Sequence, residues 1–164
     1  MSDSKPGRQL LELVKDVPFF QDFTQEEKLA LTATGCAVVR YHANEEIIVE
    51  GEMDRILYIL IRGEVGITKF QRSSDANKKP KKVVIAKLSC GSVFGEIALI
   101  NKNHRASGAQ ANGEVIALKI DGDMLERMEP ALRNKIQIQL IAILAKRLED
   151  MNNQMTDLVQ WLKM

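Results

Sequence analysis

Short apolar runs separated by turn residues fill the middle of the chain. They are rich in β-branched side chains, which are typical of strands. The runs that predict strands are 37–41, 46–49, 56–61, 65–70, 83–88, 104–111 and 114–120. Arg62-Gly63 is interpreted as a turn between two of them, and Asn112-Gly113 as a two-residue hairpin. Many short strands with regular turns predict a β-sandwich or a small barrel.

Helical patterns precede this β region. Residues 8–16 carry apolar side chains at helical spacing and stand before Pro18, which predicts a short amphipathic helix that ends near residue 16. Thr24 and Glu27 have the spacing of a capping box, so a second helix is expected to begin there. Gly35 is expected to end it, because glycine readily adopts the backbone conformation of a helix C-terminus.

A second helical region closes the chain. Asp121 is expected to cap a short helix over 122–128, and Pro130 to occupy the first position of a long one. Apolar residues in 131–164 alternate steps of three and four, which is a heptad seam: Ile141, Leu144, Leu148, Met151, Met155, Leu158 and Leu162. Either the distal half pairs with a second copy as a parallel homodimer, which we favour, or the whole stripe folds back on its own domain.

Composition limits the classes of protein. The chain has 164 residues, 45% of them hydrophobic, and a net charge of +1, so neither nucleic acid nor membrane is an expected partner. No apolar run reaches the roughly 18 residues of a membrane span, and the N-terminus lacks a signal-peptide core. Cys36 and Cys90 lack metal-ligand spacing, so we expect reduced thiols in a cytoplasmic protein. The lysine-rich segment 78–82 is either a basic patch or, as we prefer, a solvated hairpin tip.

The most informative stretch is 91–107, which lies between two predicted strands. Gly95 permits close approach of a ligand to the backbone, and the residues after it favour one helical turn, whose first N–H groups attract an anion. Glu96 is an acceptor for hydroxyl groups, and Arg105 matches the oxygens of a phosphate. An acid for a sugar hydroxyl and an arginine for a phosphate together indicate a nucleotide.

The pattern Phe94-Gly95-Glu96-Ile97-Ala98-Leu99, five further residues and Arg105-Ala106-Ser107 resembles the phosphate-binding cassette of cyclic nucleotide-binding domains. Such domains occur in the regulatory subunits of cAMP-dependent kinases, in cyclic-nucleotide-gated channels and in bacterial catabolite activators. The resemblance implies that Glu96 accepts the ribose 2′-hydroxyl and that Arg105 pairs with the cyclic phosphate. It also implies that backbone N–H groups near Gly95, Ala98 and Ala106 complete the cradle, and that Ala86 and Leu88 face the purine.

The resemblance also implies a fold and a domain plan. The fold is mainly β, an eight-stranded jelly-roll barrel with N-terminal helices and a long C-terminal helix. We expect a flexible N-terminus over 1–7, the binding domain over 8–130, and a lid and dimerisation helix over 131–164. Residues that the resemblance makes candidates for a lid over the base are Asn152, Asn153 and Trp161, although Trp161 has the alternative role of covering apolar surface.

The expected function is a non-enzymatic sensor. Thr often follows the cassette arginine in domains tuned to cGMP, whereas Ala106 stands here, so cAMP is the expected ligand. His42 and His104 are far apart, and no catalytic triad or metal-ligand set stands out, so we expect binding without turnover or cofactor. Two alternatives remain: a dimerising structural domain with a silent pocket, and the sensory fragment of a larger transcription factor, channel or enzyme. The downstream protein partner is not identified.

Overall fold

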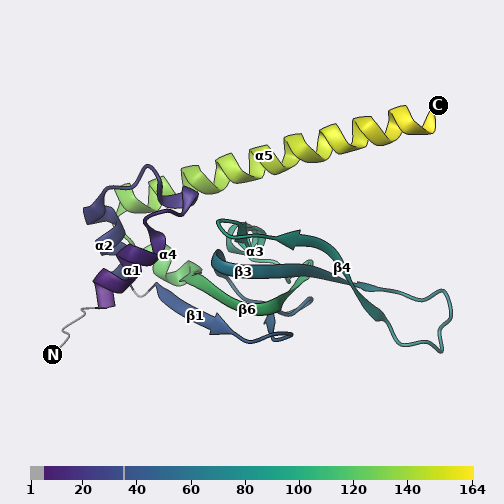
Figure 1. The fold of residues 1–164 in the computed structure, drawn as a ribbon, viewed down its shortest axis with the longest axis horizontal. Helices are drawn as coiled ribbons and strands as arrows, with labels where there is room; N and C mark the ends of the chain where they lie inside the picture. Colours follow the sequence, from purple (N-terminus) through teal and green to yellow (C-terminus); the bar gives the residue numbers. More distant parts are fainter. Residues whose placement is uncertain (1–5, 35) are drawn as a thin grey trace. The chain divides into compact units, whose positions relative to one another are not determined.

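The computed structural model describes residues 6–34 and 36–164. Contacts along the chain divide it into two compact units, one ending at Arg127 and the other spanning Met128–Met164. The first unit holds a β-sheet structure with short helices, and the second holds one long helix (Figure 1). The helices of the described residues are α1 (Pro6–Val14), the 3-10 turn η1 (Pro18–Phe20), α2 (Gln25–Ala33), α3 (Glu96–Asn101), α4 (Gly122–Arg127) and α5 (Pro130–Leu162).

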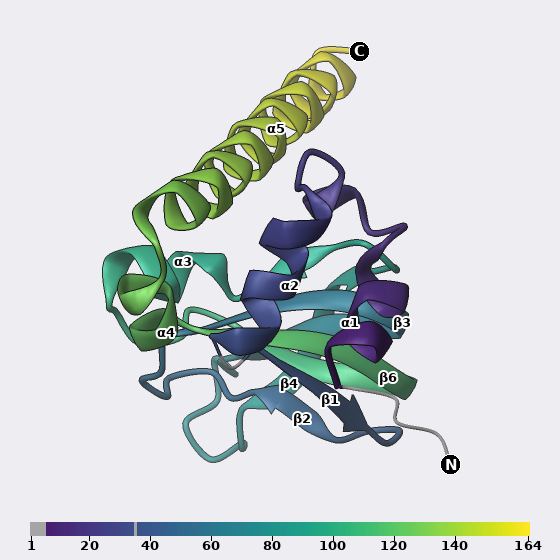
Figure 2. The ribbon, with the colours of Figure 1, turned by 90° about the vertical axis from the view of Figure 1, so that its left-hand side faces the viewer.

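Helix α1 covers Pro6–Val14, two residues earlier at each end than the predicted 8–16, whereas α2 begins at its predicted N-cap. The capping box is confirmed: the Glu27 N–H donates to Thr24 Oγ1 over 3.2 Å, and the Thr24 N–H donates to Glu27 Oε2 over 2.9 Å. Helix α2 has Thr34 as its C-cap, and the stop predicted at Gly35 lies outside the described residues, as does most of the predicted flexible N-terminus. Figure 2 shows α1 and α2 side by side.

The paired strands are antiparallel, and two of them each combine two predicted strands. They are β1 (Ala37–Tyr41), β2 (Glu46–Ile48), β3 (Ile56–Gln71), β4 (Lys81–Leu88), β5 (Val93–Phe94) and β6 (Gly108–Asp121). The turn predicted at Arg62-Gly63 and the hairpin predicted at Asn112-Gly113 are wrong, because each dipeptide lies inside a continuous strand. The strand predicted over 104–111 begins only at Gly108.

Both dipeptides bend their strands instead of reversing them. Gly63 and Gly113 have φ of +96° and +91°, values that favour glycine. The β3–β6 register shifts at this level, between the pairs Arg62↔Ile116 and Glu64↔Asn112. Because the two strands are paired on both sides of the shift, they bend together as a bulge. A Cβ at Gly63 would lie 2.3 Å from the Glu114 carbonyl oxygen, so the bend also requires a residue without a side chain.

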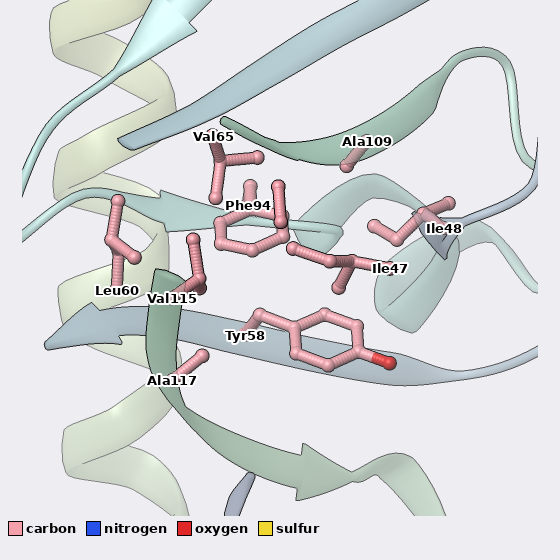
Figure 3. Close-up of a cluster of buried hydrophobic side chains, with 10 residues drawn as sticks. Ile47, Ile48, Tyr58, Leu60, Val65, Phe94, Ala109, Val115 and Ala117 are labelled. Atoms are coloured by element: carbon pink, nitrogen blue, oxygen red, sulfur yellow. The ribbon is translucent and has the colours of Figure 1, made fainter. Parts of the chain in front are cut away.

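The bend creates the two layers of the fold. The first half of β3 pairs with β5 and with the second half of β6, which pairs with β1. The second half of β3 pairs with β4 and with the first half of β6, which pairs with β2. Each layer therefore has four strand segments, and the predicted jelly-roll barrel with flanking helices is confirmed. Side chains from both layers meet in a common core, shown in Figure 3, that includes Tyr58, Val65, Phe94 and Val115.

The two C-terminal helices begin where the sequence predicts. Asp121 Oδ1 accepts the Asp123 N–H over 2.8 Å at the start of α4, which supports its predicted capping role. Pro130 stands in the first turn of α5, as predicted, and the helix continues to Leu162. The apolar side chains along its distal half are exposed: Leu148, Met151, Met155, Leu158, Trp161 and Leu162. Among the described residues, no helix combines the length and the apolar character needed to cross a bilayer.

Candidate functional site

The cassette begins where β5 passes into α3. Gly95, between them, has φ of +81°. A Cβ there would lie 2.7 Å from the Ile56 carbonyl oxygen and 2.9 Å from Arg105 Nη1, so a side chain would collide with both. Phe94, just before it, is buried and stacks on Tyr58 with ring centroids 5.2 Å apart. Gly95 therefore has a packing reason for being glycine, and Phe94 belongs to the core.

The two charged residues of the cassette are buried. Only three buried side chains among the described residues are polar or charged, namely Thr68, Glu96 and Arg105. Burying a charge costs several kcal/mol unless it is paired or hydrogen-bonded, so such residues need a specific reason to be inside. Two of these three residues are the acid and the base that the sequence pattern identified.

Arg105 is bound on several sides by its own protein. Its guanidinium makes a close bidentate ion pair with Asp54, in which Nε donates to Oδ2 over 3.1 Å and Nη2 donates to Oδ1. Nη2 also donates to the Ile56 carbonyl over 2.6 Å, and Nη1 donates to the Gly95 carbonyl over 2.8 Å. These contacts use four of the five N–H donors of a guanidinium, which explains how the side chain is tolerated in a buried position.

The loop 50–54 also holds the cassette through its backbone. The Gly51 N–H donates to the Arg105 carbonyl and the Arg105 N–H donates to the Glu52 carbonyl, both over 2.8 Å. His104 Nδ1 lies 2.9 Å from the Gly51 carbonyl oxygen. These contacts take the place of strand pairing before Gly108, which explains why β6 starts later than predicted. Gly51 has φ of +87°, a value that favours glycine.

A second cation lies beside the C-terminal end of the cassette, Arg105-Ala106-Ser107, which we call its exit. The Lys69 ammonium donates to the Ala106 carbonyl and lies 3.3 Å from Glu50 Oε1. Glu50 Oε2 accepts the Phe70 N–H over 2.8 Å. That hydrogen bond is the largest cause that holds the pKa of the Glu50 carboxyl below its ordinary value, and Lys69 adds to the effect. Lys69 and Glu50 therefore connect β3 to the segment that carries Arg105.

The remaining predicted site residues fall into three groups. The cassette residues Ala98 and Leu99 are buried, Ser107 is half-buried, and Ile97 and Ala106 are exposed. On β4, Ala86 is exposed opposite Ile67, and Leu88 is half-buried against the core opposite Val65. Residues predicted for a lid, all exposed and all on α5, are Asn152, Asn153 and Trp161. Their contact with a base stays a prediction.

Three residues at the exit were missed by the sequence reading. No contact with the cassette was predicted for Asp54, Glu50 or Lys69. The loop 50–54 could have been identified from the sequence, because three of its five residues are acidic: Glu50, Glu52 and Asp54. A buried arginine needs such an acidic partner. Lys69 carries no comparable signal, because its contact with Ala106 spans 37 residues of sequence.

Comparison with known proteins agrees with this geometry. The sequence profile of the family described as "Cyclic nucleotide-binding domain" matches residues 38–129. The "CRP-like cAMP-activated global transcriptional regulator" of Mycobacterium tuberculosis is 32% identical over 121 residues, which are 74% of this chain and 51% of that protein. The "cAMP-dependent protein kinase regulatory subunit" of Mycosarcoma maydis is 29% identical over 114 residues, which are 69% of this chain and 20% of that protein.

Solved structures show the same fold. The crystal structure of a cyclic nucleotide-binding domain from Methylobacillus flagellatus superposes with a TM-score of 0.72 at 24% identity, covering 90% of this chain and 81% of that one. The chain spans about half the length of the mycobacterial regulator and a fifth of the kinase subunit. The profile match covers more than half of the chain and includes the whole cassette with both of its buried charges. The chain therefore belongs to the cyclic nucleotide-binding domain family.

Proposed function

We propose that this chain binds a cyclic mononucleotide, with cAMP preferred, and that it acts as a regulatory module without chemical turnover. The observation that carries the proposal is the burial of both charged cassette residues, Glu96 and Arg105, at the spacing that the family uses. A buried arginine that keeps one N–H donor beyond its protein contacts can hydrogen-bond an anionic ligand. Both curated relatives described above have regulatory names, which supports a role other than catalysis.

Each cassette residue has a role in this proposal. Glu96 accepts the ribose 2′-hydroxyl, and Arg105 offers the phosphate the one guanidinium N–H that its four protein contacts leave. Backbone N–H groups near Ala98 and Ala106 complete the phosphate cradle. Ala86 and Leu88 on β4 flank the purine. Ala106, in place of a threonine, favours cAMP over cGMP.

The output of the module is proposed to run through α5. Ligand binding regulates a protein only if the free and bound states differ at an output surface. The heptad seam of α5 leaves large apolar side chains exposed in its distal half, which supports pairing with a second copy of the chain. We propose that cAMP changes the position of α5, with Asn152, Asn153 or Trp161 closing over the base, and thereby changes this dimer or the surface offered to a downstream protein.

The setting of the module is also a proposal. Cys36 and Cys90 are free thiols, and burial raises the pKa of Cys36 to about 11, so it stays protonated and unreactive near neutral pH. Free thiols are typical of the cytoplasm. Because both curated relatives are longer than this chain, a sensory part of a larger regulator is the second candidate function.

A ligand panel tests the proposal. The protein is unfolded and refolded to remove bound nucleotide, and its melting temperature is measured with cAMP, cGMP, 5′-AMP and 2′-deoxy-cAMP. We expect the largest stabilisation with cAMP, less with cGMP and with the 2′-deoxy analogue, and none with 5′-AMP. Equal stabilisation by 5′-AMP would contradict a cassette for cyclic phosphates, and no stabilisation by any of the four would leave the dimerising scaffold as the function.

A further inference from the structure

The charges at the cassette suggest that an anionic ligand needs a further cation there. Asp54 cancels the charge of Arg105 in a close ion pair, and Glu96 is a further buried acid. A cyclic phosphate brings one more negative charge. Like charges in a poorly hydrated site repel strongly, so an anionic ligand needs another cation nearby. The residues that the family resemblance identifies do not include one.

Lys69 is placed to be that cation. Its ammonium lies at the carbonyl of Ala106, the residue that follows the cassette arginine, and its side chain is 46% exposed. By contrast, the Arg105 side chain is 4% exposed and is committed to protein acceptors. An anion that approaches the exit of the cassette from solvent therefore finds Lys69 more accessible than Arg105.

We propose that Lys69 is a second phosphate-binding residue, which leaves Glu50 and contacts a phosphate oxygen when the nucleotide binds. This inference rests on the proposed function, because the ligand is the cyclic phosphate that the cassette holds. It assigns Lys69 a direct contact with the ligand and assigns Glu50 the role of a competitor that holds the cation in the empty site.

Movement of Lys69 from Glu50 to the phosphate costs the protein little folding free energy. The pair joins a half-exposed lysine to a glutamate whose side chain is 21% exposed, so we expect its contribution to stability to be modest. The lysine stem has enough rotatable bonds to move its ammonium by several ångströms. Glu50 keeps a partner when Lys69 leaves, because its other oxygen accepts the Phe70 N–H. The departure of Lys69 therefore leaves the Glu50 carboxylate hydrogen-bonded, and the Ala106 carbonyl that it also leaves belongs to an exposed residue.

Two substitutions in the same ion pair separate this role from a purely structural one. Lys69→Met removes the charge and keeps the stem, whereas Glu50→Gln removes the competitor and keeps an oxygen for the Phe70 N–H. We expect calorimetric affinity for cAMP to fall about tenfold in Lys69→Met, the size of one charge-assisted hydrogen bond at a half-exposed site. In Glu50→Gln the affinity is expected to be unchanged or higher. A structural pair would instead weaken binding in both variants alike, and that result would overturn the proposal.

A matched control comes from the same hairpin. Lys87 lies 3.9 Å from Glu64 in another exposed pair, and Lys87→Met changes the net charge as Lys69→Met does. We expect Lys87→Met to bind like the wild type, so an equal loss in both variants would overturn the proposal by showing a general charge effect. Added salt is expected to weaken binding less in Lys69→Met than in the wild type, because one screened contact is missing.

The failures of the two proposals are distinguishable. Wild-type protein that binds cAMP while Lys69→Met binds it equally well would overturn the role of Lys69 and leave the proposed function standing. Wild-type protein that binds neither cAMP nor cGMP would overturn the proposed function, and the role of Lys69 with it. The phosphorothioate diastereomers of cAMP give a further readout, because a residue that touches one phosphate oxygen changes their affinity ratio. An unchanged ratio in Lys69→Met would count against direct contact.

Discussion

The exit of the cassette and the distal half of α5 depart from an ordinary domain in opposite ways. At the exit, charged side chains are withdrawn from water, with Arg105 4% and its partner Asp54 31% exposed. Along distal α5, large apolar side chains stay in water, with Leu148 60% and Met155 63% exposed. Buried charge and exposed apolar surface are the informative exceptions in a folded protein. We propose that the first is a site for a polar ligand and that the second is a surface for an apolar partner.

Among the substitutions considered, removal of Arg105 is expected to have the largest effect on stability and on ligand binding. Arg105→Ala removes the ion-pair partner of Asp54, which keeps the Ile56 N–H as a donor, and removes the guanidinium donors of two backbone carbonyls. We therefore expect a loss of about 3 kcal/mol in the free energy of unfolding. Binding of cAMP is expected to be lost as well. Urea unfolding followed by calorimetry checks both.

Arg40→Ala is the matched control for this experiment. Arg40 forms an exposed ion pair with Glu114 at 3.3 Å, with both side chains more than half exposed. We expect a change of less than about 0.5 kcal/mol, because exposed pairs contribute little. Comparable losses in Arg40→Ala and Arg105→Ala would contradict the claim that burial distinguishes the cassette arginine.

A charge on the heptad seam tests the other half of the comparison. Leu148→Asp places a carboxylate at a position that each of the two chains would bury in the proposed dimer. We therefore expect the free energy of dimerisation to weaken by at least about 3 kcal/mol. Gln160→Asp lies on the opposite face of the helix and should leave the dimer intact. Analytical ultracentrifugation measures both variants, and a monomeric wild type would contradict the proposed partner surface.

Glu96→Gln is expected to have a smaller effect that is specific to the ligand. The amide accepts a weaker hydrogen bond than a carboxylate does, so affinity for cAMP should fall about tenfold, roughly 1.4 kcal/mol. Affinity for 2′-deoxy-cAMP, which lacks the hydroxyl, should change little. Competition binding with the two nucleotides measures the ratio, and an equal loss for both would contradict the ribose contact.

Acid should produce the smallest effect. The pKa of the Glu50 carboxyl lies below its ordinary 4.5, chiefly because of the hydrogen bond from Phe70, so its contribution to stability is present above that pH. This contribution is lost as the pH falls below about 4.5 and through the lowered pKa. The melting temperature of the wild type should therefore fall slightly more on acidification than that of Glu50→Gln. Parallel pH profiles would show that the contact with Phe70 contributes nothing.

Short-range and long-range features of the molecule differ in how well the sequence predicts them. The capping box at Thr24, the short helix after Gly95 and the long helix α5 depend on residues a few positions apart, and sequence pattern alone predicted them. Glu96 and Arg105 were identified because their chemistry and spacing match a nucleotide cassette. How Arg105 is held was not predictable, because its partner Asp54 is 51 residues away and only the folded sheet brings them together.

The strand errors have a related cause. Asn112-Gly113 allows a positive φ, and that conformation serves a hairpin and a bulge equally well. The choice depends on β3, which bends at Gly63 beside it and keeps β6 continuous. Local residues therefore specified the backbone conformation, whereas the neighbouring strand determined the direction of the chain.

Calorimetric titration of the refolded chain with cAMP decides whether the cassette binds a cyclic nucleotide. The account predicts saturable binding with one cAMP per chain at micromolar or lower dissociation constant, weaker binding of cGMP, and no heat from cAMP with Arg105→Ala. Absence of binding by a wild-type protein that is folded and free of nucleotide would contradict the account, because the buried charges of the cassette would then have no ligand to complete them.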